Sequence, residues 1–519
     1  MLELPERYNV STVLDRNLEA GREAKAAVCW DGGELTYGEL YRRACAFGRA
    51  LRALGVRREE RVLLVLDDTW AFPVAFLGAI RLGAVPIPVN PLLRAEEYRY
   101  FLEDSYARVV VTEAGLAPKI LEALKGLSDR TLLVLGEPLP EAPPGLPVHR
   151  LEELLEAHAG ELLPADTHRD DMAFWLYSSG STGRPKGVVH LQHDIPYTCE
   201  TYAKHVLAIS EADITFSASK LFHAYGLGNN LSFPYWVGAT TVLLHGRPTP
   251  EAVLSTIERF RPTLFFTVPT LYNAILNHPG AKGRDVSSIR LCVSAAEPLP
   301  PEIWRRWKET FGLVILDGVG STEMLHIYCS NTLKDLKPGS SGKPVPGYEL
   351  RVLSPEGHPV PPGEAGDLYV KGDSALAFYW HHHEKTKRAL QGEWFYTGDR
   401  YRVDEEGFYW YEGRSDDMIK VKGLWVSPIE VENALMEHPA VREAAVVGVQ
   451  VEGLTRIKAY VILKAGHAPS EALTQELQEW CKARLRPYQY PEFVVYVEDF
   501  PRTATGKVQR FKLRELQEA

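Results

Sequence analysis

Residues 177–187 hold the densest group of side chains in this sequence that suit phosphate binding. The segment reads Tyr-Ser-Ser-Gly-Ser-Thr-Gly-Arg-Pro-Lys-Gly and directly follows an apolar stretch. Glycines let a backbone curl so that several N–H groups point inward and form a nest for phosphate oxygens. Ser179, Ser181 and Thr182 add hydroxyl donors, and Lys186 adds a positive charge. A plain surface loop is the alternative, but this concentration of donors after a strand favours a polyphosphate site.

A Walker-type loop is the obvious rival, and the spacing excludes it. That loop ends in Gly-Lys-Ser or Gly-Lys-Thr. Here Pro185 precedes Lys186 and Gly187 follows it. The segment therefore predicts a phosphate site of another kind.

Alternating strands and helices surround this loop and must position it. Thr36 and Glu39 form a capping-box pattern at the start of a helix expected over 35–54. Apolar strands are expected at 61–66, 84–89, 108–112 and 131–135, with helices between them, and again at 172–176, 240–244, 263–268, 290–293 and 314–316. Strands separated by helices predict an α/β fold with mainly parallel sheets.

The pattern changes in the last third of the chain. Residues 339–412 read as short strands between glycine and proline turns, which predicts a small β-barrel-like subdomain. A compact α+β segment starts at Ile429. We therefore expect a large N-terminal domain over 1–415 and a small C-terminal domain over 416–519.

Composition restricts the class of protein. The chain has 519 residues, 45% hydrophobic and 24% charged, which is typical of a globular protein with more than one domain. Its net charge of -10 disfavours a nucleic-acid partner. The sequence shows no membrane-spanning run and no signal segment, and its six cysteines have no metal-like spacing. These features predict a cytoplasmic enzyme or binding protein without a membrane partner, and they leave a homodimer open.

The phosphate segment and four later motifs together resemble one family. The string YSSGSTGRPKGV is similar to the phosphate-loop signature of adenylate-forming enzymes, which include acyl- and aryl-CoA ligases, luciferases and peptide-synthetase adenylation domains. GVGSTE at 318–323, YTGD at 396–399, GRSDDMIKVKG at 413–423 and PRTATGKVQR at 501–510 follow in the family's order. The resemblance covers nearly the whole chain and implies a mobile C-terminal domain.

By this resemblance the chain binds ATP and Mg²⁺ and joins a carboxylate to AMP. Glu323 matches the magnesium-binding glutamate, and Thr182 is a second candidate ligand. Asp399 matches the aspartate that holds the ribose, and Arg414 supports the ribose and phosphate region. The complete nucleotide set implied is Ser178, Ser179, Gly180, Ser181, Thr182, Gly183, Lys186, Ala296, Glu297, Pro298, Asp317, Gly318, Val319, Thr322, Asp399 and Arg414. Val319 departs from the aromatic residue that many relatives place against the adenine.

Lys507 is the residue that the resemblance makes catalytic, together with Thr182 and Glu323. A lone lysine near a C-terminus is usually solvated, but here it matches the lysine that bridges the carboxylate and the α-phosphate. An ammonium group there offsets the repulsion between two reacting anions. Asp416 matches the hinge about which the C-terminal domain rotates after adenylation. Lys422, Gly423 and Trp425 then line the tunnel for coenzyme A.

The acid itself is predicted from two further segments, 221–230 and 321–328. They look like the benzoate and 4-hydroxybenzoate–CoA ligase branch of the family. His223 would gate the acyl site, and Ala224, Tyr225, Gly320 and His326 would line a flat pocket for an aryl ring. His326 and Tyr225 are about as readily explained as core residues, so these assignments depend on the resemblance.

The favoured hypothesis is an aryl acid–CoA ligase that uses a small aromatic carboxylic acid, ATP and coenzyme A. Two alternatives stay open: an adenylating enzyme with another acid, such as a fatty acid, or another acceptor, such as a carrier-protein thiol; and a non-catalytic nucleotide binder. Lys507, Glu323 and Asp399 together speak against the binder, because binding alone does not need a mobile lysine.

Overall fold

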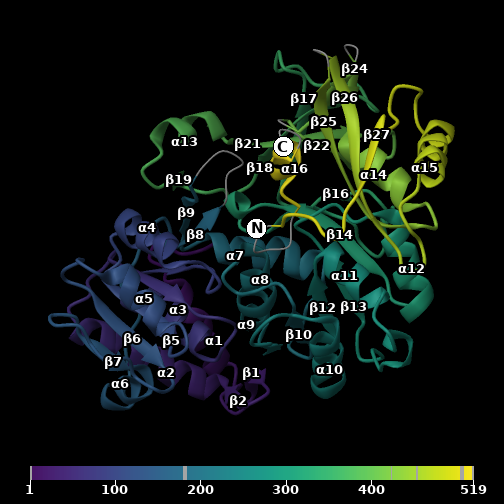
Figure 1. Ribbon diagram of the computed structural model, residues 1–519. Helices are drawn as coiled ribbons and strands as arrows, with labels where there is room; N and C mark the ends of the chain where they lie inside the picture. Colours follow the sequence, from purple (N-terminus) through teal and green to yellow (C-terminus); the bar gives the residue numbers. More distant parts are fainter. Residues whose placement is uncertain are drawn as a thin grey trace.

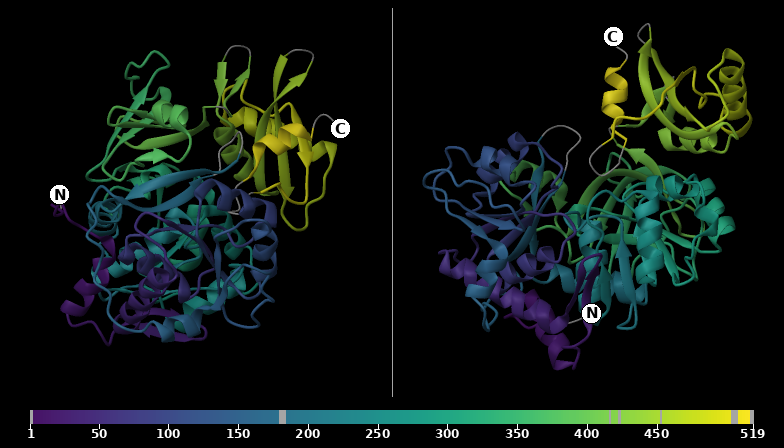
Figure 2. Two further views of the ribbon diagram at one scale, coloured as in Figure 1. Left: turned by 90° about the vertical axis from the view of Figure 1, so that its left-hand side faces the viewer. Right: turned by 60° about the horizontal axis from the view of Figure 1, so that its bottom comes forward.

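The computed structural model describes residues 3–178, 184–415, 417–421, 424–451, 454–502 and 508–516, and of Trp425 it describes the backbone alone. Within these residues no helix is both long enough and apolar enough to cross a bilayer. Figures 1 and 2 show a large body built from the first four fifths of the chain and a smaller yellow C-terminal part at one end of it. The fold is the α/β arrangement predicted from the sequence, with a large N-terminal and a small C-terminal domain.

Two mainly parallel sheets form the large body. The first has the order β4-β3-β5-β6-β7 and contains the predicted strands β3 (Arg61–Val65), β4 (Val85–Pro88), β5 (Val109–Glu113) and β6 (Thr131–Leu135), with β7 (Val148–Arg150) at its edge. All of its pairs are parallel. The connecting helices are α3 (Ala71–Leu82), α4 (Ala95–Ser105) and α5 (Ala117–Leu124). The parallel pairing follows from the strand–helix–strand pattern, because each helix carries the chain back to the same edge.

The second sheet has nine strands in the order β16-β15-β14-β13-β12-β10-β11-β1-β2. Its parallel centre consists of β1 (Ala26–Trp30), β10 (Ile214–Ser217), β11 (Thr240–Val242), β12 (Leu264–Thr267), β13 (Leu291–Ser294) and β14 (Ile315–Gly320). The antiparallel strands β2 (Gly33–Thr36), β15 (Ile327–Ser330) and β16 (Lys343–Pro344) close its ends. The sequence pattern did not predict the β1–β2 hairpin, whose strands are short and only partly buried.

The predicted helix at 35–54 is α2 (Tyr37–Ala53), and its capping box is confirmed. The Thr36 side chain accepts a hydrogen bond from the Glu39 N–H, and the Glu39 carboxylate accepts one from the Thr36 N–H. This reciprocal pair satisfies two of the donors that a helix start leaves unpaired.

A three-stranded antiparallel sheet, β19-β9-β8, carries the phosphate segment. It contains β8 (Met172–Ser178), β9 (Lys186–Leu191) and β19 (Phe378–Tyr379). The predicted β-rich region forms an antiparallel sheet of β17 (Glu349–Leu353), β18 (Ala365–Lys371), β20 (Leu390–Gln391), β21 (Trp394–Val403) and β22 (Tyr409–Arg414).

The C-terminal part contains the α+β elements expected there. Strands β25 (Val441–Val451), β26 (Leu454–Leu463) and β27 (Phe493–Tyr496) form one sheet, and β23 (Ile419–Val421) pairs with β24 (Leu424–Val426). Helices α14 (Pro428–Met436), α15 (Glu471–Arg484) and α16 (Arg510–Glu515) accompany them. Arg510 and Glu432 form a buried two-pronged ion pair that ties α16 to α14.

Candidate active site

The two ends of the phosphate segment are the paired ends of a β-hairpin. Strand β8 ends at Ser178 and β9 begins at Lys186, and these two residues are register partners. On the far side of the segment, the Tyr100 hydroxyl of α4 donates to the Pro185 carbonyl at 2.7 Å, and the Arg184 guanidinium lies 5.1 Å from the Tyr100 ring centre. Helix α4 therefore tethers the segment where it joins β9. The predicted ligands Ser179, Gly180, Ser181, Thr182 and Gly183 lie outside the described residues.

Glu323 lies next to this hairpin, as the motif predicted. It belongs to a single turn of helix, η5 (Thr322–Met324), between β14 and β15. Its Oε1 accepts hydrogen bonds from the Tyr379 hydroxyl at 2.9 Å and from the Ser178 hydroxyl at 3.2 Å. Among the residues that the structure describes, both of these hydrogen bonds to the carboxylate end on Oε1.

Lys186 lies beside the side chains that contact Glu323. Its ammonium lies 4.3 Å from the centre of the Tyr379 ring, whose hydroxyl binds Glu323. Burial lowers the pKa of Lys186 below its usual range, although the nearby Glu323 carboxylate opposes this effect. Ser178, Lys186, Glu323 and Tyr379 will be called the phosphate site. The Lys186 ammonium and the Glu323 carboxylate both contact the side chain of Tyr379, and both charged residues are only partly exposed to solvent.

Asp399 and Arg414 face each other across the strand pair β21–β22. They are register partners, and Arg414 Nη1 donates to Asp399 Oδ1 at 3.0 Å and to the Thr397 carbonyl at 3.1 Å. The Arg414 charge also contributes to lowering the pKa of Lys186, so it lies within electrostatic reach of the phosphate site. The motifs that contain Asp399 and Arg414 are far from the phosphate segment in the sequence but lie near it in the structure.

The segment predicted at the adenine follows β13. Ala296 adopts a left-handed backbone with φ 74°, which is uncommon for a residue other than glycine. The Glu297 carboxylate accepts a hydrogen bond from Thr270 at 2.9 Å, and Pro298 follows it. Asp317 lies on the neighbouring strand β14 with its side chain buried, and burial raises its pKa well above the usual range. Asp317 is thus withdrawn from solvent on the strand that leads to Gly318 and Val319.

The glycines of the next motif are required by close backbone contacts. Strand β14 carries Gly318, Val319 and Gly320 and pairs with β15, with an irregularity at Val319 and Gly320. A Cβ atom at Gly320 would lie 2.5 Å from the His326 carbonyl oxygen, and one at Gly318 would lie 2.9 Å from the Cys329 carbonyl oxygen. Neither strand position accepts a side chain without a backbone shift. The close pairing of β14 with β15 therefore fixes the position of the turn between them, which carries Thr322 and Glu323.

Three of the predicted acyl residues, His223, Ala224 and Tyr225, lie at the start of a helix that passes from α-helical to π-helical and back to α-helical hydrogen bonding. His223 precedes α8 (Ala224–Leu227), the π-helical segment η3 (Gly228–Ser232) follows, and α9 (Phe233–Val237) continues. Such π segments are frequent at functional sites. Ala224 is buried, and the Tyr225 hydroxyl donates to the Val293 carbonyl at 3.1 Å. The helix thus joins the acyl residues to the sheet that carries the adenine segment.

His326 lies against this helix and is neutral. Its Nε2 lies 3.1 Å from Asn229 Oδ1 and 3.3 Å from the Tyr225 carbonyl oxygen, so Nε2 carries the proton. Burial lowers its pKa to about 3. A Cβ atom at Gly228 would lie 2.3 Å from the His326 ring, so the glycine makes room for it. Tyr202, Tyr225 and Phe233 surround the ring at centroid distances of 5.2, 5.5 and 4.5 Å.

Several predicted residues cannot be placed. Lys507, Asp416, Lys422 and Gly423 lie outside the described residues, as does the side chain of Trp425. The residues on either side of 503–507 are described, and Arg502 and Val508 form an isolated β-bridge. The Arg502 guanidinium forms ion pairs with Glu443 and Asp499.

The structure adds residues that the sequence reasoning missed. Tyr379 and His190 contact Glu323 and Thr322, and Asn229 sets the proton position on His326. Asn229 lies within the segment 221–230 that was assigned to the acid, but a single tyrosine or asparagine carries no signal by itself. The role of a residue that supports a site residue becomes visible only in the folded protein, where segments that are distant in the sequence lie together.

The fold and these motifs define an adenylate-forming enzyme. Residues 14–380 match the family described as AMP-binding enzyme, and residues 430–507 match the AMP-binding enzyme C-terminal domain. The chain belongs to the AMP-binding enzyme family, which confirms the resemblance seen in its motifs.

Similar proteins in this family activate aromatic acids. The chain is 47% identical over 517 residues to a benzoate–CoA ligase from Thauera aromatica, covering 99% of this chain and 97% of the relative. A solved benzoate CoA ligase from Burkholderia xenovorans LB400 is 48% identical with a TM-score of 0.90, over 98% of this chain and 100% of that one. A solved anthranilate CoA ligase in complex with anthranoyl-AMP is 42% identical with a TM-score of 0.95, over 99% and 98% of the two chains.

Proposed function

We propose that this protein is an ATP-dependent aryl acid–CoA ligase. It activates a benzoate-type carboxylate as an acyl-adenylate with release of pyrophosphate, and it then transfers the acyl group to the thiol of coenzyme A with release of AMP. The observation that supports this most strongly is the convergence of Ser178, Lys186 and Glu323 at the ends of the phosphate segment. Full-length similarity to ligases for aromatic acids supports the choice of substrate class.

In the first half-reaction a carboxylate oxygen attacks the α-phosphorus and the bond to pyrophosphate breaks. Negative charge grows on the phosphoryl oxygens, so positive charge held in place before the reaction lowers the barrier. Lys186 and the backbone of 179–183 would bind the departing pyrophosphate. Lys507 would lie between the carboxylate and the α-phosphate, and Asp399 would accept hydrogen bonds from the ribose hydroxyls.

The oxygen-bearing side chains proposed at the phosphate site suit Mg²⁺. A carboxylate and a hydroxyl oxygen are the hard ligands that this ion takes, usually one or two protein groups together with phosphate oxygens. Glu323 would hold it, with Thr182 as the second candidate. Bound there, Mg²⁺ supplies charge neutralisation for the phosphates. The part of the chain that the structure describes contains no group of three or more His, Cys, Asp or Glu side chains arranged to hold a metal, so a dedicated all-protein metal cage is absent from it.

In the second half-reaction the thiolate sulfur forms a bond to the acyl carbon, and the bond from that carbon to the AMP oxygen breaks. The thiol proton leaves to solvent. We propose that the chain divides at 415/416 and that the C-terminal domain rotates about Asp416 between the two steps. This rotation brings Lys422, Gly423 and Trp425 to the coenzyme A arm. A cytoplasmic location suits these soluble substrates, and a homodimer is compatible with the proposal.

The acid would bind between His223, Ala224, Tyr225, Gly320 and His326. These residues offer aromatic and backbone surfaces with neutral polar groups, which is what a planar ring needs. His326 contributes no charge at neutral pH, because burial lowers its pKa to about 3.

Pyrophosphate release tests the proposal directly. Purified protein with ATP and Mg²⁺ is given benzoate, 4-hydroxybenzoate, 2-aminobenzoate or a medium-chain fatty acid, each with and without coenzyme A. We expect pyrophosphate and thioester with at least one aromatic acid. Pyrophosphate without thioester would indicate another acceptor, and no pyrophosphate with any acid would indicate a nucleotide binder.

A further inference from the structure

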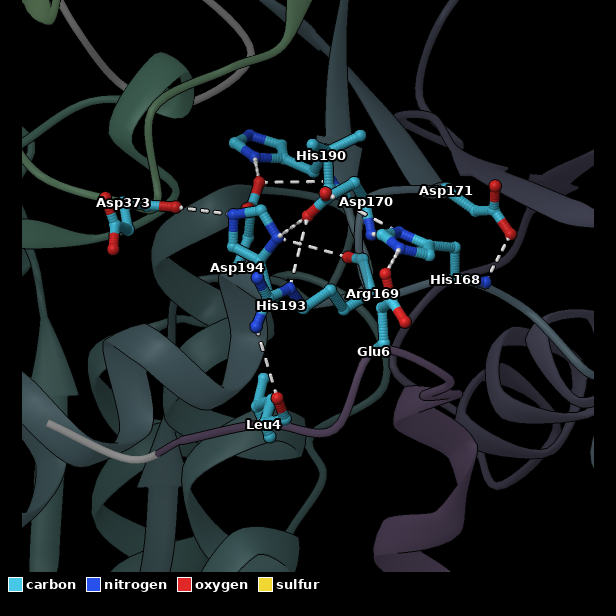
Figure 3. A network of polar contacts seen from close by, with 11 residues as sticks. Leu4, Glu6, His168, Arg169, Asp170, Asp171, His190, His193, Asp194 and Asp373 are labelled. Carbon is cyan, nitrogen blue, oxygen red and sulfur yellow. Dashed lines mark hydrogen bonds and ion pairs between the residues drawn. The ribbon is translucent and has the colours of Figure 1, made fainter.

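His190 is a fully buried histidine that lies behind the phosphate site. It sits on β9, four positions after Lys186, with 0% of its side chain exposed. Its Nδ1 lies 2.7 Å from Asp194 Oδ2 and its Nε2 lies 2.8 Å from the Thr322 carbonyl oxygen. Figure 3 shows the ring and the Asp194 carboxylate facing each other. The side chain thus connects the strand that leaves the phosphate segment to the turn that carries Glu323.

These two contacts fix where the proton lies. A carbonyl oxygen only accepts hydrogen bonds, so Nε2 must carry a hydrogen. The Asp194 carboxylate lies at the other ring nitrogen, with Oδ2 2.7 Å from Nδ1. Asp194 is itself held at the start of α7 (Asp194–Thr198), where its Oδ2 also accepts from the Leu191 N–H at 3.1 Å. The aspartate therefore orients the ring and keeps its donor aimed at Thr322.

Within the turn, the Thr322 carbonyl also accepts a hydrogen bond from the Leu325 N–H at 3.1 Å, and the His190 hydrogen bond joins the same carbonyl to β9. Thr322 directly precedes Glu323, and the Glu323 carbonyl accepts from the Leu376 N–H at 2.7 Å. One carbonyl of the turn is thus held by β9, and the next is held by the segment leading to β19. Displacement of either would move the Glu323 carboxylate relative to Ser178 and Lys186.

Stability alone is a weak explanation for this pair. Burying two ionisable groups costs desolvation energy that their attraction often only offsets. Val188, two positions earlier on the same face of β9, is apolar and equally buried. An apolar residue at 190 would pack against Phe174, whose ring now stacks on His190 with centroids 5.3 Å apart.

We infer that His190, oriented by Asp194, is a positioning residue that sets the Glu323 carboxylate against the ends of the phosphate segment and so determines how well the site uses Mg²⁺. The inference rests on the proposed function of Glu323. It adds a hydrogen-bonded chain from Asp194 through His190 to the backbone of Thr322, which acts without touching nucleotide or metal.

Two amide variants separate this role from simple packing. His190→Gln places an amide N–H near the position of Nε2, within reach of the Thr322 carbonyl. His190→Asn keeps a polar partner for Asp194 but is too short to reach Thr322. Both are neutral and similar in polarity, so their difference reports the Thr322 hydrogen bond. Val189→Ala loosens the same strand without removing a hydrogen-bond donor and serves as the control for folding.

The first measurement is the affinity for ATP by calorimetry, with Mg²⁺ and with EDTA, alongside the melting temperature. Groups that orient a metal ligand typically change metal affinity by about 10- to 100-fold. We expect His190→Asn to lose most of the increase in ATP affinity that Mg²⁺ gives the wild type, and His190→Gln to retain it. Equal behaviour of the two amides, or an unchanged Mg²⁺ effect in His190→Asn, would overturn the inference.

The second measurement is each half-reaction. Acyl-AMP formation should fall about tenfold in His190→Asn and recover in His190→Gln, while thioester formation from supplied acyl-AMP stays near the wild-type rate. Parallel loss of both half-reactions, matched by Val189→Ala, would show a structural role only and overturn the inference. If the wild type itself releases no pyrophosphate, the proposed function fails, and the ATP-binding experiment still decides the role of His190.

Discussion

The phosphate site and the acyl site meet at the turn over residues 320–326, yet they are built from opposite kinds of side chain. The phosphate site joins a lysine and a glutamate through the ring and hydroxyl of Tyr379. The proposed acyl site includes Ala224, Tyr225 and His326, whose buried ring is neutral. Only the first is arranged to interact with ionic charge.

This difference reflects what each site has to stabilise. A polyphosphate brings several negative charges, so its site needs cations and oxygens held in place before the reaction. An aromatic ring brings apolar surface, and a charge left unpaired beside it would be costly. Changes in the phosphate site should therefore slow every acid by a similar factor, whereas changes in the acyl site should alter the preference among acids.

The largest effect is expected for Lys507→Ala. Loss of an ammonium that offsets repulsion between the two anions should reduce acyl-AMP formation by about 10²-fold or more. Thioester formation from supplied acyl-AMP should continue, because that step does not need this charge. Separate assays of the two half-reactions measure this. Equal loss of both would remove Lys507 from its assigned role.

The second largest effect is expected for Glu323→Gln. The rate of acyl-AMP formation should fall about 10- to 100-fold, and a higher Mg²⁺ concentration should be needed for half-maximal rate. The amide keeps the size of the side chain but removes the charge that a hard cation prefers. Rates measured over a range of Mg²⁺ concentrations with two different acids test it. A change in the preference between the acids would contradict the separation of the two sites.

A smaller effect is expected for Tyr379→Phe, which removes the hydrogen bond to Glu323 and keeps the ring beside Lys186. A hydrogen bond to a charged group contributes about 1.5–3 kcal/mol in total. Only the part that strengthens in the transition state slows the reaction, so adenylation should fall by up to about tenfold. Tyr369→Phe, on a half-buried tyrosine of β18, is the matched control. If the two variants lose the same activity, Tyr379 does not support Glu323.

The smallest effect is expected for His326 of the proposed acyl site and concerns the pH dependence of the free energy of unfolding. Burial lowers the pKa of His326 to about 3 from its usual 6.5, so the unfolded chain binds a proton that the folded protein rejects between these values. Stability contributed by this site is therefore present above about pH 6.5 and is lost as the pH falls. Between pH 7 and pH 5 the loss is about 2 kcal/mol.

His326→Gln removes the titrating group and should make unfolding less sensitive to this change of pH by that amount. Urea unfolding midpoints at pH 7 and pH 5 measure it, with the exposed His467→Gln as the control. The same pH sensitivity in His326→Gln as in the wild type would show that His326 is not held neutral. The preference among aromatic acids should also shift in this variant and not in the control.

The sequence predicted the elements and most of the residues that meet at the site. The capping box at Thr36 and Glu39 and the parallel strands are confirmed. Of the motif residues, Lys186 and Glu323 both contact Tyr379, and Asp399 pairs with Arg414, while their roles stay predictions. The β1–β2 hairpin, the π-helical turn at Asn229 and the contacts of His190 were missed. Their residue types are ordinary. The hydrogen bonds from His190 to Thr322 and between His326 and Asn229 join residues more than 90 positions apart along the chain.

What the sequence determined by itself is the local chemistry: a glycine- and hydroxyl-rich segment suited to phosphate, strands and helices in alternation, and a family order of motifs. Those features depend on neighbouring residues and so are readable along the chain. The tertiary structure decided which hydrogen bonds form between distant segments, which charges face each other and which groups lose water. His326 is neutral because burial lowers its pKa to about 3, and His190 reaches the Thr322 carbonyl only because the fold brings β9 against that turn.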